Sequence, residues 1–270
     1  MISLTENRRM LGYGLLHSYS NISHFLTTRH GGHSEGTYAS FNCSPYSGDE
    51  AGKVRLNQDI LCKELGPSLQ QLVIPCQTHG TNVLAVDDNF IHLSVEGRQE
   101  MLHGVDALIT RQPGHCLCIS TADCVPVLLY DKKHKAIAAV HAGWRGTVAF
   151  IVGHTLEKMR MAFGTEGQDI IACIGPSISL ESFEVGEEVY EAFRLNGFDM
   201  SRISLWRKET GKHHIDLWEA NGMQLLDFGV PGSQIEIAGI CTYIHHDDFF
   251  SARRLGIKSG RILSGIMLKE

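Results

Sequence analysis

The sequence predicts an α/β (α+β) protein in which mixed sheets form a sandwich, as a single domain over residues 1–270. Apolar runs of strand length dominate the chain, and segments with helical periodicity lie irregularly between them, whereas a doubly wound fold would alternate strand and helix regularly. No repeat, low-complexity tract or linker interrupts the chain, and glycine and proline are scattered at turns. A length of 270 residues also suits one large domain.

The first third of the chain predicts three strands and one helix. The run 24–28 reads as a strand followed by a glycine turn. A helix is predicted over 49–65, because its apolar residues lie roughly on one face and Gly66 and Pro67 end it. The runs 72–76 and 82–86 are short and apolar and flank the polar segment 77–80, which predicts strand, turn and strand.

The middle of the chain predicts the core of the sheet. Four apolar runs, 105–110, 116–121, 125–130 and 136–141, read as strands, and the polar segment 131–135 makes the last two a hairpin. A helix over 147–163 follows, with Gly164 suited to its C-terminal cap. The remaining elements are a strand at 170–174, helices at 187–193 and 217–228, and strands at 235–240 and 262–268.

Composition and charge exclude several classes of function. The net charge is −6 and the isoelectric point is near 6.2, without a basic stripe interleaved with aromatics, so neither nucleic acid nor an anionic membrane is an expected partner. The first residues lack the apolar region of a signal peptide, and no apolar run has transmembrane length. We therefore expect a cytoplasmic protein whose eight cysteines are mostly reduced, buried thiols.

The predicted hairpin brings one thiol and one imidazole together. Cys124 directly precedes the strand 125–130, and His141 ends the strand 136–141. Since hairpin strands lie side by side, the two residues can share a site. A thiol beside an imidazole either binds a metal or forms a nucleophile–base pair.

A second histidine, His79, lies in the turn 77–80 and makes a three-ligand metal site conceivable. One cysteine and two histidines suit zinc, and three protein ligands leave a fourth position open, as in catalytic zinc sites. The spacing contains no compact ligand motif, however. On spacing alone, a core thiol with hydrogen-bonded turn histidines explains the pattern equally well.

Arginines beside glycine or aromatic residues favour an anionic substrate. Arg29 precedes a glycine turn, Arg145 lies where a helix begins, and Arg253 is the first of an arginine pair. Guanidinium groups bind phosphate in a bidentate manner, although any one of these could be a surface residue. Four carboxylates could transfer protons: Asp106, Asp123, Glu184 and Asp216. Their alternative role is to cap turns or to form supporting hydrogen bonds.

Five blocks in order along the chain resemble the YfiH-type proteins, also described as laccase-like or polyphenol-oxidase-like and as peptidoglycan editing factors. These blocks are 27–32, 77–80, 121–124 through 141–146, 174–176 with 183–186, and 241–243 with 249–254. The sequence departs from the usual pattern at 43–49, at 244–246 and at Ala252. These departures concern the shape of the pocket rather than the core of the site.

The resemblance implies a fold shared with toxin cysteine deamidases and a metal site, usually described as zinc, at His79, Cys124 and His141. It also implies a purine nucleoside phosphorylase acting on adenosine, inosine, guanosine and methylthioadenosine, with adenosine deaminase activity. Cys124, His141 and Arg29 are then the expected catalytic residues, with Arg29 holding phosphate. Purine nucleoside and phosphate are the expected small-molecule partners.

Two alternatives remain open at this point. The first is a metal-free hydrolase acting on peptidoglycan precursors, in which His141 deprotonates Cys124 for attack on an amide carbon. Only the metal site needs His79, so this residue discriminates between the two chemistries. The second is a copper polyphenol oxidase, with copper as the bound metal. The sequence disfavours it because multicopper sites need tight His-x-His clusters, and the chain has none.

Overall fold

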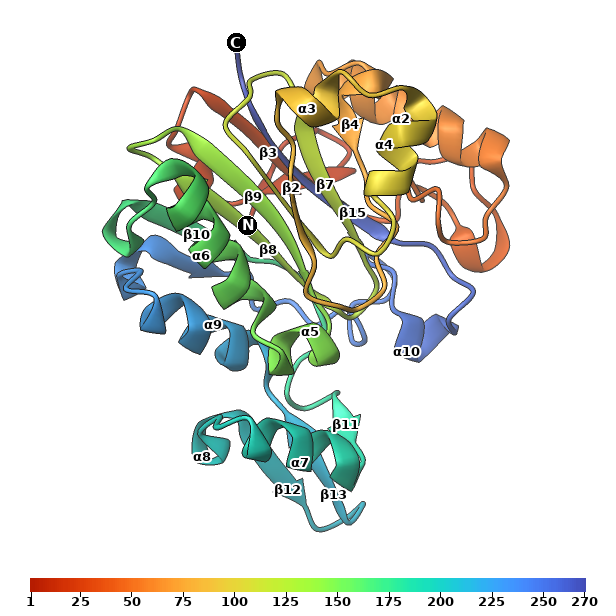
Figure 1. Cartoon of the computed structure of the whole chain (residues 1–270). Helices are drawn as coiled ribbons and strands as arrows, with labels where there is room; N and C mark the ends of the chain where they lie inside the picture. Colours follow the sequence, from red (N-terminus) through yellow and green to blue (C-terminus); the bar gives the residue numbers. More distant parts are fainter.

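The computed structural model describes residues 1–270 and consists of two packed six-stranded sheets, a small third sheet and flanking helices (Figure 1). The first sheet has the order β1 (Ile2–Ser3), β2 (Met10–Gly12), β3 (Ile22–Thr27), β15 (Ile262–Leu268), β7 (Cys116–Thr121) and β4 (Leu72–Val73). The second has the order β14 (Ile235–Ile237), β10 (Ile170–Ile174), β8 (Val125–Asp131), β9 (Ala136–Ala142), β6 (Ala107–Thr110) and β5 (Val83–Ala85). Both sheets mix parallel with antiparallel pairs, so the predicted mixed-sheet sandwich is confirmed.

Side chains alternate along the strands between two apolar layers. In β9, Ile137 and Ala139 point into the core between the two sheets, where they meet Leu117 and Ile266 of the first sheet. The intervening Ala138 and Val140 belong to a different cluster on the opposite face of the second sheet. Because each strand buries both of its faces, the predicted core strands read as continuous apolar runs.

Helices cover the two outer faces of the sandwich. The helices α6 (Ile151–Phe163) and α9 (Leu217–Asp227) pack on the second sheet through residues such as Leu156 and Leu225. Helix α2 (Ala51–Leu65) contributes Leu61 to a third cluster on the outer face of the first sheet. The short helices are α1 (Gly14–His17), α3 (Asp88–Ile91), α4 (Val95–Met101), α5 (Trp144–Val148) and α10 (Ala252–Leu255).

A small lobe projects from one end of the sandwich (Figure 1). It contains β11 (Glu184–Val185), β12 (Ser204–Arg207) and β13 (Lys212–Ile215), with α7 (Glu187–Leu195) and α8 (Met200–Ile203). Its buried residues, among them Phe193 and Ile215, belong to the same apolar cluster as the outer face of the second sheet. The lobe and the sandwich therefore share one core.

The structure corrects one predicted helix and shows where one predicted pair of strands lies. The helix predicted over 147–163 is divided into two helices, α5 and α6, because Phe150 between them adopts a left-handed backbone conformation (φ 58°). The ring of Phe150 stacks on the ring of Phe198 in the small lobe. The predicted strands on either side of segment 77–80 are present as the shorter strands β4 and β5. They lie in different sheets, since β4 joins the first sheet beside β7 and β5 joins the second beside β6. That segment therefore crosses from one sheet to the other.

Candidate metal centre

His79 lies on the segment that crosses between the sheets, and Asp106 holds that segment in place. The backbone N–H groups of Thr78, His79 and Gly80 all donate to the carboxylate of Asp106, at 3.3, 3.0 and 2.8 Å. His79 itself has a positive φ of 63°, which turns the chain sharply at this point. Three convergent donors thus fix the backbone from which the exposed imidazole extends.

The side chain of Gln77 fastens the same segment to the first sheet. Its amide oxygen accepts from the backbone N–H of Ser120 at 2.7 Å, and its amide nitrogen donates to the carbonyl of Ser120 at 2.9 Å. The amide therefore pairs with the end of β7 as a neighbouring strand would. This pairing holds His79 at the edge where β7 turns toward Cys124.

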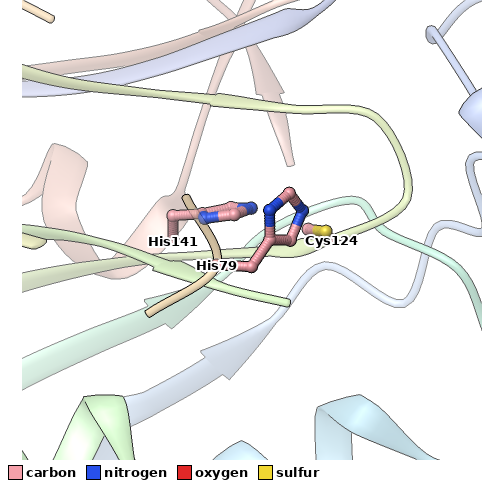
Figure 2. A group of neighbouring side chains, drawn as sticks. All are labelled: His79, Cys124 and His141. Atoms are coloured by element: carbon pink, nitrogen blue, oxygen red, sulfur yellow. The ribbon is translucent and has the colours of Figure 1, made fainter. Parts of the chain in front are cut away.

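Cys124 and His141 meet across the β8–β9 hairpin, as the sequence predicts. Pro126 is opposite His141 in the register, and Cys124 directly precedes β8. The ligand atoms of His79, Cys124 and His141 all lie within 4.8 Å of one another, and the two imidazoles stand edge to face (Figure 2). These three residues could hold a metal ion, because a thiolate and two imidazoles match the softness of zinc and leave a position free.

Asp106 also orients His141. Its Oδ1 lies 2.7 Å from Nδ1 of His141, and both side chains are almost fully buried. A carboxylate accepts only, so Nδ1 carries the proton and Nε2 is left to face Cys124 or a metal. Burial raises the pKa of the Asp106 carboxyl, but the hydrogen bonds from His141 and the backbone outweigh it and hold the pKa below its usual value.

The electrostatics of the site favour the thiolate of Cys124. Burial raises the pKa of this thiol, but the neighbouring imidazoles of His141 and His79 outweigh it and lower the pKa to about 6. Burial alone would lower the pKa of His141, whereas Cys124 and Asp106 together raise it. The thiolate is the form that binds metals and the form that attacks carbon.

Gly143 leaves the space that the ligands occupy. A Cβ atom at this position would lie 2.9 Å from Cδ2 of His79 and 3.1 Å from Sγ of Cys124. Both distances are shorter than ordinary van der Waals contacts. Glycine is therefore required here by close approach, since its φ of −68° is open to any residue.

The three ligands lie at the wall of a cavity of about 510 Å³, a volume suited to a small molecule. Apolar and aromatic side chains, among them Trp144, Ile178 and Phe183, form part of the wall. The charged side chains that line it, apart from the histidines, are Asp123, Arg253 and Arg261. The cavity therefore combines an apolar surface with two cations and one carboxylate.

The predicted arginines are not equivalent in the structure. Arg253 lines the cavity, but Arg29 does not, because its guanidinium donates to the carbonyls of Ala39 (2.8 Å) and His246 (2.7 Å) and packs over the ring of Phe250. Arg145 stacks on Trp144 and does not line the cavity either. The expectation that Arg29 holds phosphate therefore has no support from its position.

The four predicted carboxylates also differ in their positions relative to the cavity. Asp106 has the supporting role described above, and Asp123 lines the cavity from a turn with a φ of 84°. Glu184 forms an ion pair with Lys212, and Asp216 caps α9. Neither of these two lines the cavity.

The remaining cysteines are reduced and mostly buried, as expected. Sγ of Cys116 lies 3.7 Å from Sγ of Cys118 on the same face of β7, without a disulfide between them. Burial raises the pKa of the thiols of Cys43, Cys118 and Cys173. These three thiols are therefore expected to be less reactive than the thiol of Cys124.

Comparison with known proteins agrees with this architecture. A family model described as "Multi-copper polyphenol oxidoreductase laccase" matches residues 23–269. The crystal structure of YfiH from Bacillus licheniformis superposes with a TM-score of 0.89 at 31% identity, over 97% of each chain. The chain belongs to the YfiH-type family. The resemblance inferred from the five blocks is thus confirmed.

Two relatives of this YfiH-type chain carry enzyme names. A protein of Bacteroides thetaiotaomicron named purine nucleoside phosphorylase is 72% identical over 270 residues, the whole of both chains. Adenosine deaminase RL5, from an unknown prokaryotic organism, is 41% identical over 252 residues, which cover 93% of this chain and 96% of that protein. No helix of the YfiH-type chain is both long enough and apolar enough to cross a bilayer.

Some residues of this YfiH-type site carry no clear signal in the sequence. Arg261 lines the cavity, yet it is one arginine before an ordinary strand. Gln77 belongs to a recognised block, but its pairing with Ser120 spans 43 residues and cannot be read from spacing. Three residues at positions where the sequence departs from the family pattern line the cavity: Ser44, Tyr46 and Ala252.

Proposed function

We propose that this protein is a zinc-dependent purine nucleoside phosphorylase acting on adenosine, inosine, guanosine and methylthioadenosine, with adenosine deaminase activity. The observation that carries the proposal is the convergence of His79, Cys124 and His141 at the wall of a cavity of nucleoside size. The names of the two relatives support the choice of substrates.

Zinc is the metal that best fits these donors. His79, Cys124 and His141 would hold it, and Asp106 would keep His141 in the tautomer that presents Nε2. Bound zinc supplies Lewis acidity, which polarises a water molecule or a substrate oxygen. Copper is disfavoured because the site has one cluster of three ligands and the sequence has no His-x-His motif.

In phosphorolysis, an oxygen of hydrogen phosphate bonds to C1′ of the ribose. The C1′–N9 bond breaks, its electron pair leaves with the purine, and the proton of the phosphate ends on the purine. We assign phosphate binding to Arg253, whose guanidinium makes one hydrogen bond, of 3.2 Å to the carbonyl of Glu184, and therefore keeps free donors. Arg261 adds positive charge from a position fixed by hydrogen bonds to backbone carbonyls.

The apolar part of the cavity would bind the purine. Trp144, Ile178 and Phe183 offer flat or apolar surfaces that exclude water from the base. For deamination, a water oxygen bonds to C6 of adenosine, and the C6 amino group leaves as ammonia. The same contacts to base and ribose would then serve with water as the nucleophile in place of phosphate.

Metal analysis combined with a turnover screen tests this proposal. The purified protein should contain about one zinc per chain and should release free base from adenosine, inosine or guanosine only when phosphate is present, with ribose 1-phosphate as the second product. Removal of the metal should abolish turnover, and re-addition of zinc should restore it. Free base without phosphate would indicate hydrolysis, and absence of turnover with every nucleoside would refute the proposal.

A metal-free cysteine hydrolase is the second candidate, and one observation favours it. Asp106, His141 and Cys124 lie in the order acid, imidazole, thiol, which is the arrangement of a nucleophile with its base and orienting carboxylate. A His79→Ala variant separates the two, since the hydrolase does not need this side chain. Loss of both zinc and activity supports the metal site, whereas full activity without metal would favour the hydrolase on peptidoglycan precursors.

A further inference from the structure

Asp123 lies at the cavity wall between a metal ligand and the arginine assigned to phosphate. We infer that its carboxylate accepts hydrogen bonds from the 2′- and 3′-hydroxyls of the ribose and so makes the enzyme specific for ribonucleosides. This inference rests on the proposed function and extends it to the sugar. Asp123 directly precedes Cys124, and it lines the same cavity.

The carboxylate is held rigidly by two protein donors. Its Oδ1 accepts from the hydroxyl of Thr242 at 2.7 Å, and its Oδ2 accepts from the backbone N–H of Arg253 at 2.7 Å. Each carboxylate oxygen can accept two hydrogen bonds, so each keeps one further acceptor position. Two acceptor positions on one rigid carboxylate match the two adjacent hydroxyls of a ribose.

Asp123 is the only charged acceptor that the cavity offers to a sugar, because it is the only carboxylate that lines the cavity. The amide oxygen of Gln77 accepts from Ser120 and keeps a single further acceptor position. The hydroxyls of the cavity wall belong to Ser44, Tyr46, Ser120 and Thr121 and are neutral, and both arginines are donors only. When a ribose enters the cavity, its hydroxyls lose the water molecules that accepted their hydrogen bonds. The protein must supply acceptors in their place, because a buried hydroxyl without a partner is unfavourable. Asp123 can replace two of them with charged acceptors on two fixed oxygen atoms.

The position of Arg253 fits this assignment. Its backbone N–H contacts Asp123, and its side chain lines the cavity, so a phosphate on Arg253 would lie beside a sugar held by Asp123. Phosphate attacks C1′, which is bonded to C2′. A carboxylate on the 2′-hydroxyl next to an arginine on the phosphate would therefore bring the two reacting atoms together.

The test compares inosine with 2′-deoxyinosine and 3′-deoxyinosine in phosphorolysis, using the zinc-loaded wild-type enzyme and the Asp123→Asn variant. Asparagine can keep both protein contacts, by accepting from Arg253 and donating to Thr242, but it presents one acceptor fewer to the sugar. Asp248→Asn is the matched control, because Asp248 lies outside this cavity. Zinc content and thermal stability are measured for all three proteins.

We expect the wild-type enzyme to prefer inosine over each deoxynucleoside by about 10- to 100-fold in kcat/KM, as for a hydrogen bond to a charged group. In Asp123→Asn, kcat/KM should fall by a similar factor for inosine and for the deoxynucleoside whose remaining hydroxyl used the lost acceptor. It should change little for the other deoxynucleoside, while zinc content stays the same. For each substrate, kcat/KM of the variant is divided by kcat/KM of the wild type. This ratio removes the difference in intrinsic reactivity between inosine and the deoxynucleosides.

Three results would overturn the inference: no preference for ribose in the wild type, an equal loss on all three substrates in Asp123→Asn, or no loss at all. If Asp123→Asn does not fold, Thr242→Val replaces it, because it removes only the hydroxyl that orients Oδ1, and it should reduce the preference for ribose. If the wild type turns over no nucleoside, the proposed function fails. Calorimetric binding of the same three nucleosides then decides the role of Asp123 separately.

Discussion

Oδ1 of Asp106 lies 2.7 Å from Nδ1 of His141 and 3.0 Å from the backbone nitrogen of His79, so one oxygen atom supports two of the three candidate ligands. The same carboxylate is fully buried and accepts further N–H groups from the 77–80 segment. The geometry of the candidate metal centre therefore depends on a residue outside the three candidate ligands.

Replacing Asp106 by asparagine should weaken metal binding. An amide cannot accept from His141 and from three backbone donors at once, so part of this network is lost, and we expect zinc affinity to fall about 10- to 100-fold. The free energy of unfolding should fall by about 3 kcal/mol, because buried donors lose their partner. Chelator competition and chemical denaturation measure the two effects. Unchanged affinity would show that Asp106 does not orient the ligands.

Replacing Gly143 by alanine should impair the site and leave the fold intact. The added methyl group would lie 2.9 Å from His79 and 3.1 Å from Cys124, which displaces both ligands, while the backbone conformation suits alanine. We expect a loss of zinc affinity of at least about 10-fold with a nearly unchanged Tm. Gly52→Ala, in α2 with no atom within 4 Å of the new Cβ, is the control and should bind zinc normally. Equal zinc affinity in both variants would contradict the packing described here.

Removing the metal should expose one unusually reactive thiol. The pKa of Cys124 is lowered by its two histidines, whereas burial raises the pKa of Cys43 and Cys118. At pH 7 the metal-free protein should therefore react with iodoacetamide first at Cys124, and zinc should protect this residue. Peptide mass spectrometry after short exposure identifies the labelled site. Equal labelling with and without zinc would argue against Cys124 as a ligand.

His24 should make the stability of the fold depend on pH. This side chain is buried and accepts the backbone N–H of Tyr13, and burial lowers its pKa to about 4, below the ordinary value of 6.5. Above pH 6.5 the residue is neutral in both the folded and the unfolded chain, so it does not change stability there. Between pH 6.5 and 4 only the unfolded chain takes up the proton, which lowers the free energy of unfolding by about 3 kcal/mol.

A His24→Gln variant isolates this contribution, because glutamine can accept the same hydrogen bond and does not titrate. Denaturation of both proteins at several pH values should show curves that diverge between pH 6.5 and 4, with the wild type falling more steeply. Parallel curves would show that His24 is accessible to protons in the folded chain.

The local sequence was enough to predict the elements that bury apolar residues. The runs 116–121, 125–130 and 136–141 are long, apolar and bounded by turn residues, and all three are strands in the structure. The hairpin also follows from the sequence, since only a short polar segment separates its strands. Because the hairpin is local, the meeting of Cys124 and His141 could be predicted as well.

Contacts between distant segments could be decided only by the tertiary structure. The sequence indicates that Asp106, Asp123, Arg29 and Arg253 are polar residues near turns, but not which of them share a cavity. The carboxylate of Asp106 meets His141 because β6 pairs with β9, and Arg29 is removed from the site because its donors are taken by Ala39 and His246. Hydrogen bonds across tens of residues depend on how the strands pair, and apolar periodicity does not specify that pairing.

The sequence by itself determined the family, through five ordered blocks, and the hairpin that joins Cys124 and His141, because these depend on residue identity and on local turns. The proposed ligand set, with His79 as its third member, follows from the family resemblance. The tertiary structure decided that Asp106 supports the ligands, that Gly143 leaves room for them and that Asp123 and Arg253 face the cavity together. Those roles depend on the direction in which each side chain points after two sheets have packed, and sheet packing is set by the whole chain.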